Sequence, residues 1–196
     1  KISLENSQSF FLKVNDSSTN DMFVKEAHGL EELQKAGAIR VPKVLEYDKL
    51  FILLEFIEQG KSADNFFDNF GRSFANLHRY SNESFGFYED NYIGSTQQIN
   101  IPDENEKKSW TEFYFNKRLL SQYHLAEKNG YATSELKKGI SFLESNMEKI
   151  LSGSAEAPSL LHGDLWLGQQ SYEKAEKKLL EEACELAIQK SGLQKQ

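Results

Sequence analysis

The residues most able to do chemistry lie near the C-terminal end, in a His-Gly-Asp turn at positions 162–164. Leu160 and Leu161 lead into this turn, and the amide of Gln169 follows five residues after Asp164. Kinase-type phosphoryl-transfer enzymes use this spacing: the aspartate accepts the proton of the attacking hydroxyl, and the amide helps to hold magnesium on the phosphates. Because aspartate is also favoured at helix N-caps, the turn alone leaves an ordinary cap equally open.

The phosphoryl-transfer interpretation needs a phosphate-binding lysine and an acidic partner upstream. Residues 9–14 predict a β-strand, with Lys13 set among aromatic and branched side chains. Residues 22–33 predict a helix, because apolar side chains recur at helical spacing, and Glu26 lies in its middle. We therefore predict that Lys13 contacts the phosphates of a nucleotide and that Glu26 aims it. The alternative is that both are solvated surface charges, as most lysines and glutamates are.

The remaining elements that would position these residues follow from local patterns. Residues 50–57 form a strongly apolar run that predicts a second strand. Residues 84–100 are rich in glycine, asparagine and aromatic side chains, which favours an exposed recognition loop. Helices are expected over residues 62–79, where an aromatic stripe should be core, and over residues 110–129, 134–150 and 171–189.

Composition limits the class of protein. The chain has 196 residues and a formal net charge of −7, which argues against a protein that coats nucleic acid. No apolar stretch is long enough to cross a bilayer, so we expect no membrane partner. The single cysteine, Cys184, excludes an internal disulfide and fits a reducing compartment, which makes the cytoplasm the default location.

With these residues in view, the chain resembles the fructosamine/ketosamine kinase family, a branch of the aminoglycoside phosphotransferase and choline-kinase-like fold. The matching pieces keep their order and spacing from about residue 9 to residue 168. They are residues 10–15, 22–30, 41–42, 53–57, 77–79, 85–87, 91–100, 110–114, 117–119 and 158–168.

The resemblance implies an α+β, two-lobed protein-kinase-like fold that is incomplete at both ends. Residues 1–57 would form a small sheet-plus-helix lobe that binds the nucleotide. Residues 58–170 would form a larger helical lobe with the catalytic loop. Residues 171–196 would add a charged amphipathic helix of unclear origin.

The resemblance also implies roles for single residues. Lys13 would contact the ATP phosphates with Glu26 as its partner, and Asp164 would be the catalytic base. The backbone of a hinge formed by Glu55, Phe56 and Ile57 would contact the adenine. Gln169 would hold Mg²⁺. The acceptor site would be lined by Gly94, Ser95, Thr96, Gln97, Gln98 and Trp166. The implied reaction is ATP-dependent phosphorylation of a sugar hydroxyl on a ketosamine, free or protein-bound.

The sequence departs from the family pattern at the metal side of the site. Gln169 stands where the family has asparagine, and no aspartate follows Asp164 to serve as a second magnesium ligand. Two alternatives to a ketosamine kinase therefore stay open: a kinase for an aminoglycoside or amino-alcohol, and a kinase-derived binding protein without catalysis.

As a reference for Lys13, we expect Lys25 to lie on the exposed face of its helix.

Overall fold

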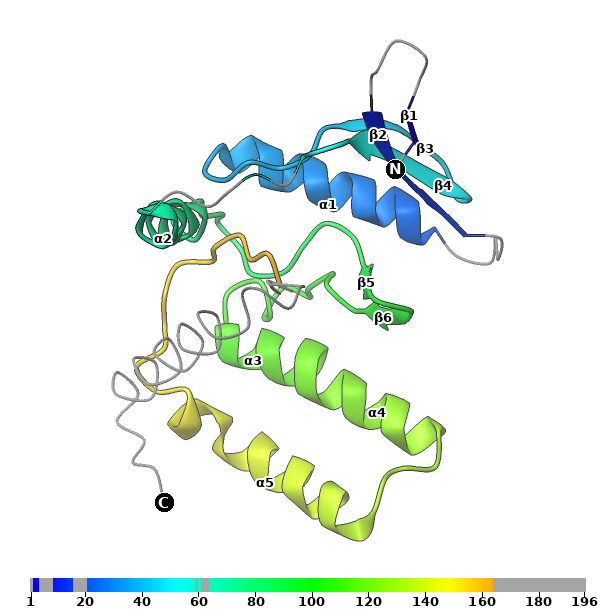
Figure 1. The fold of residues 1–196 in the computed structure, drawn as a ribbon. Helices are drawn as coiled ribbons and strands as arrows, with labels where there is room; N and C mark the ends of the chain where they lie inside the picture. The colour runs from blue at the N-terminus through cyan, green and yellow to red at the C-terminus, as the bar shows by residue number, and fades with distance from the viewer. Residues whose placement is uncertain (1, 4–8, 16–20, 59, 61–63, 164–196) are drawn as a thin grey trace.

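The computed structural model describes residues 2–3, 9–15, 21–58, 60 and 64–163 (Figure 1). Asp164, Trp166 and Gln169 lie outside the described residues, as does the predicted helix over residues 171–189, so their assignments stay predictions. None of the helices within the described ranges is long and apolar enough to cross a membrane.

A four-stranded antiparallel sheet occupies the N-terminal part. Its strands lie in the order β1 (Ile2–Ser3), β2 (Ser9–Val14), β4 (Phe51–Glu55) and β3 (Val44–Tyr47). In β4, Ile52 and Leu54 are buried and alternate with half-buried neighbours, which is the pattern of a strand with one face on a core. The predicted strands over residues 9–14 and 50–57 are thus present, the second slightly shorter than expected.

Helix α1 (Met22–Ala36) lies across the buried face of this sheet (Figure 1). Phe23 and Ala27, one helical turn apart, pack with Ile52 and Leu54 in a single apolar cluster. The helix ends at Gly37, whose φ of 60° is left-handed and whose N–H donates to the carbonyl of Gln34. Packing of α1 on β4 therefore fixes which helix residues face β2.

The rest of the described chain is mainly helical. After α2 (Phe66–Leu77) comes a short hairpin of β5 (Asn91–Ile93) and β6 (Thr96–Gln98), inside the stretch that we expected to be a loop. The helix predicted from residue 110 is continuous but changes character. Its parts are α3 (Trp110–Tyr114), the π-helical turn η1 (Phe115–Leu120) and α4 (Ser121–Lys128), and α5 (Ser134–Ile150) follows.

The aromatic stripe of α2 is less buried than we expected. Leu77 is fully buried, whereas Phe66 is 38% exposed. The phenylalanines instead stack along the helix, with ring centroids 6.0 Å apart for Phe66 and Phe70 and 5.8 Å apart for Phe70 and Phe74. The expectation of a core stripe is therefore wrong at Phe66, whose ring packs against Phe67 and Phe70 of the same helix and stays partly exposed.

The segment after α5 returns to the end of α2. Ser159 pairs with Ser81 in an antiparallel bridge, and Leu160 donates its N–H to the carbonyl of Tyr80 at 2.9 Å. Figure 1 shows this segment passing beneath α1 as it approaches Gly163, the last described residue. The start of the His-Gly-Asp turn therefore lies on the side of the helical part that faces the sheet.

Candidate nucleotide and acceptor site

The strand lysine and the helix glutamate that the sequence singled out lie together. The Nζ atom of Lys13 is 2.6 Å from Oε1 of Glu26. The register explains the contact: Lys13 pairs with Ile52 across the β2–β4 ladder, and directly opposed residues point to the same face of a sheet. Because Ile52 is buried under α1, Lys13 also points toward that helix.

The ion pair is only partly withdrawn from water. The side chain of Lys13 is 41% exposed and that of Glu26 is 29% exposed. A pair at this exposure stabilises a fold by at most about 1 kcal/mol, so stability is a poor explanation for it. An ammonium has three donors and Glu26 accepts one, so the arrangement fixes the direction of a cation that can still meet an anion. The contact with phosphate itself stays a prediction.

The predicted hinge residues lie where the chain leaves the sheet. Glu55 ends β4, and Phe56 and Ile57 begin the connection toward α2. The Glu55 carboxylate accepts hydrogen bonds from the N–H of Lys43 at 3.2 Å and from Nη2 of Arg40 at 2.8 Å, and these bonds lower its pKa. This end of β4 is therefore held by the loop before β3, while the contact with adenine stays a prediction.

A second ion-pair cluster joins α1 to the segment before β5. Lys25 Nζ lies 2.6 Å from Oε2 of Glu89, and Nδ1 of His28 lies 2.9 Å from Oε1 of the same carboxylate. The side chain of Glu89 is only 14% exposed. Hydrogen bonding to Glu89 raises the pKa of Lys25, although burial opposes the shift. The expectation that Lys25 lies on an exposed face is wrong, because the segment around Glu89 covers that face.

The predicted acceptor residues form the tip and second strand of the β5–β6 hairpin. Ile93 pairs with Thr96, which leaves Gly94 and Ser95 as the turn between the strands. A groove of about 520 Å³ lies between this hairpin and α4, and Ser95, Thr96 and Gln97 line one wall of it. Hydroxyl and amide groups of this kind suit a polyhydroxylated ligand. The acceptor role of these residues stays a prediction.

Gln98 differs from the other four, because its amide is engaged by Arg118. With the amide oxygen turned toward the guanidinium, it accepts from Nε at 3.0 Å and from Nη2 at 3.3 Å. Arg118 also donates through Nη1 to the carbonyl of Ile99 at 2.6 Å. Burial lowers the pKa of Arg118, although it stays far above neutrality for this residue type. Gln98 is thus held by the helix that follows the hairpin.

The catalytic and metal-binding assignments fall largely beyond the described chain. His162 is exposed, and Asp164, Trp166 and Gln169 follow it outside the described residues. Within those residues, no group of three His, Cys, Asp or Glu side chains could hold a metal ion. The magnesium assignment therefore rests on the Asp164–Gln169 spacing and the family resemblance.

Comparison with known proteins identifies the family. The family model for fructosamine kinase matches residues 1–186. The chain belongs to the fructosamine kinase family. It is 39% identical over 184 residues to the chloroplastic protein-ribulosamine 3-kinase of Arabidopsis thaliana, covering 90% of this chain and 55% of that protein. It is 32% identical to a candidate ketoamine kinase of Enterococcus faecium, covering 85% of this chain and 58% of that protein.

Solved structures in this family share the fold. A candidate fructosamine-3-kinase from Thermobifida fusca superimposes with a TM-score of 0.69 at 28% sequence identity, covering 84% of this chain and 56% of that one. The predicted α+β, protein-kinase-like fold is therefore confirmed. The lobe boundary near residue 57 stays a prediction. The chain spans just over half the length of these relatives.

Sequence reasoning missed three residues that connect the predicted nucleotide residues to the predicted acceptor residues: Glu89, Arg118 and the buried Asn100. A usable signal was present at the start of α1, where the N-cap residue Asp21 is followed by Lys25 and His28 at helical spacing as a polar face. A polar face facing solvent looks the same in a sequence as one facing a partner, so the pattern alone could not reveal Glu89.

Proposed function

We propose that the full-length protein transfers the γ-phosphoryl group of ATP to a sugar hydroxyl of a ketosamine. The observation that carries the proposal is the Lys13–Glu26 ion pair, in a chain that belongs to the fructosamine kinase family. Relatives named as a ribulosamine kinase and a ketoamine kinase support ketosamines as the acceptor class.

Lys13 would serve the nucleotide side of the reaction. Phosphoryl transfer is catalysed mainly by positioning and by charge stabilisation, because the transition state spreads negative charge over the phosphoryl oxygens. Glu26 fixes the Lys13 ammonium on one side at 2.6 Å, and the remaining donors can meet phosphate oxygens. Holding the cation in place before the nucleotide arrives reduces the reorganisation that the reaction would otherwise need.

Asp164 would serve the acceptor side. The hydroxyl oxygen of the ketosamine attacks the γ-phosphorus, the bond from that phosphorus to the β,γ-bridging oxygen breaks, and ADP leaves. The hydroxyl proton passes to the carboxylate of Asp164. Magnesium, when bound, would neutralise charge on the phosphates, and Gln169 is its proposed protein ligand.

The test is an acceptor comparison with the full-length protein. ADP formation is followed with a fructosamine, a ribulosamine and an aminoglycoside at equal concentrations, with ATP and Mg²⁺ present. The proposal predicts acceptor-dependent ADP formation with the first two compounds. Turnover with the aminoglycoside alone, or with none of the three, would contradict it.

A further inference from the structure

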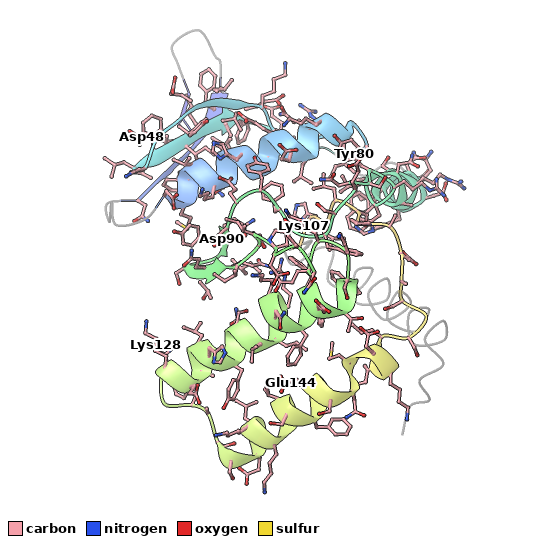
Figure 2. The ribbon with its side chains drawn as sticks, turned by 180° about the vertical axis from the view of Figure 1, so that it is seen from behind. Asp48, Tyr80, Asp90, Lys107, Lys128 and Glu144 are labelled. Atoms are coloured by element: carbon pink, nitrogen blue, oxygen red, sulfur yellow. The ribbon has the colours of Figure 1, made fainter. Side chains whose placement is uncertain are left out.

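One face of α1 is joined to the region of β5 by three polar contacts. Lys25 and His28 are three residues apart and share a face of α1, and Asp21 is the N-cap residue that directly precedes the helix. Lys25 and His28 both contact the carboxylate of Glu89, and Oη of Tyr92 donates to Oδ1 of Asp21 at 3.0 Å. Figure 2 shows Asp90, the neighbour of Glu89, between α1 and the α3–α4 helix.

Helix α1 therefore makes ion pairs in two directions. Glu26 faces Lys13 at the sheet, whereas Lys25, its neighbour in sequence, faces Glu89. Successive residues of an α-helix point about 100° apart, so a rotation of α1 would move both contacts together. The position of the Lys13–Glu26 pair is thus tied to that of the segment before β5.

The segment around Glu89 is in turn fixed by the buried side chain of Asn100, which is 4% exposed. Its Nδ2 donates to the carbonyl of Glu89 at 3.3 Å and to Oδ1 of Asn91 at 2.8 Å. Its Oδ1 accepts from Nη2 of Arg118 at 2.7 Å. Arg118 also binds Gln98, so an unbroken run of contacts reaches β6.

We propose that Glu89 is a positioning residue that makes nucleotide binding and acceptor binding reinforce each other. It holds α1, and with it the Lys13–Glu26 pair, at a fixed place relative to the hairpin of residues 94–98. Binding of one ligand would then stabilise the relative position of α1 and the hairpin that the second ligand needs, so the second would bind more tightly. This inference rests on the proposed function, because it takes the pair as the nucleotide side and the hairpin as the acceptor side.

The local chemistry favours Glu89 as the central residue of this connection. Its two carboxylate oxygens each contact a different α1 side chain, Lys25 and His28. The His28 ring also makes a T-shaped contact with the ring of Tyr47 on β3, with centroids 5.9 Å apart and planes at 88°. Loss of the carboxylate would release both α1 contacts at once, whereas loss of either partner would release only one.

A contact that only stabilised the fold would predict something different. Removing it would lower the resistance to denaturant but leave the effect of one ligand on the other unchanged. The two explanations are therefore distinguished by the ratio of the nucleotide affinities measured with and without acceptor. This ratio measures the coupling between the two sites directly, whereas a run of contacts between them does not.

The experiment uses full-length protein, a non-hydrolysable ATP analogue with Mg²⁺, and a lysine-derived fructosamine, with affinities measured by titration calorimetry. In the wild type, saturating acceptor should tighten analogue binding about 5- to 150-fold, the usual range for coupled sites. Glu89→Gln should bring this factor close to one. Asp68→Asn is the control, because it breaks an exposed ion pair outside α1, with Arg72 at 3.0 Å.

Two further variants keep the test decisive if Glu89→Gln does not fold. Lys25→Met, which removes one of the two α1 contacts of Glu89, should reduce the coupling, and Lys25→Arg, which keeps the charge, should retain most of it. Wild-type coupling in a folded Glu89→Gln or Lys25→Met variant would overturn the proposal, as would an active wild type without coupling. Absence of ketosamine phosphorylation by the wild type would instead count against the proposed function itself.

Discussion

Lys13 and Glu26 form a 2.6 Å ion pair across the interface between β2 and α1, on the face of the sheet that buries Ile52. Two independent features of the fold place it there. The ladder register turns Lys13 toward the helix, and the packing of Phe23 and Ala27 turns Glu26 toward the sheet. The pair is consequently a product of the same contacts that form the apolar core.

The nucleotide role of Lys13 predicts a selective loss when its charge is removed. Lys13→Met should lower kcat/KM for ATP about 10- to 150-fold, because a hydrogen bond to a charged group contributes about 1.5–3 kcal/mol. Lys35→Met is the control: Lys35 forms an ion pair of the same 2.6 Å length, but its side chain is 60% exposed. Steady-state kinetics at varied ATP checks the prediction, and equal effects of both changes would contradict it.

The base role of Asp164 predicts a loss of chemistry without a loss of structure. Asp164→Asn should reduce kcat about 10²- to 10⁴-fold, because an amide cannot accept the hydroxyl proton. Binding of an ATP analogue should be retained. Initial rates and calorimetry on the full-length protein provide the two readouts, and near-normal turnover in the variant would show that another group accepts the proton.

The Lys25–Glu89 contact predicts a pH dependence of stability at the alkaline end. Hydrogen bonding to Glu89, opposed by burial and aided by the charges of Glu89 and Asp21, raises the pKa of Lys25 above 10.5. A lysine whose pKa is higher in the folded state contributes its full stabilisation at pH values below its pKa in the unfolded state. This contribution disappears as the pH rises through the pKa in the folded state. The difference in unfolding free energy between wild type and Lys25→Met should therefore be constant from about pH 7 to 9 and shrink above about pH 10.5. Denaturant titrations across this range test it, and a constant difference through the alkaline region would contradict it.

The segment that carries Glu89 has no room for a side chain at Gly86. Its φ is +93°, and an added Cβ would lie 2.7 Å from the ring of Pro102 and 2.8 Å from the carbonyl oxygen of Asn100. Gly37→Ala is the control, because its φ is +60° but no atom lies within 4 Å of the added carbon. The control should cost about 1–2 kcal/mol from backbone strain alone, and Gly86→Ala should cost more. Urea midpoints compare the two, and equal costs would mean that the segment shifts freely.

The parts of the fold that local patterns predicted are those whose periodicity is strong. Residues 9–14 and 50–57 alternate or run apolar, and the helices at 22–36, 110–128 and 134–150 repeat at helical spacing. The three-residue strands β5 and β6 have too few positions to show a period. The Lys13–Glu26 pair could be predicted because a strand lysine and a helix glutamate carry a recognisable chemistry.

The connections between elements were not predictable in the same way. Lys25 was misplaced because its partner, Glu89, lies 64 residues away in the sequence. The π-helical turn η1 is equally hidden, because its sequence reads as an ordinary helix. Its distinguishing feature is tertiary: Asn116 and Lys117 both contact the carboxylate of Glu106, which is 3% exposed, and Arg118 contacts Asn100.

The most direct test of the central claim is to identify the phosphorylated product. The full-length protein is incubated with ATP, Mg²⁺ and a fructosamine, and the product is examined by ³¹P NMR beside a parallel reaction with Lys13→Met. A kinase of this type should yield one phosphate ester on a sugar hydroxyl for each ADP formed, and the variant should yield much less. ADP without any sugar phosphate ester, or an equal yield from the variant, would contradict the account.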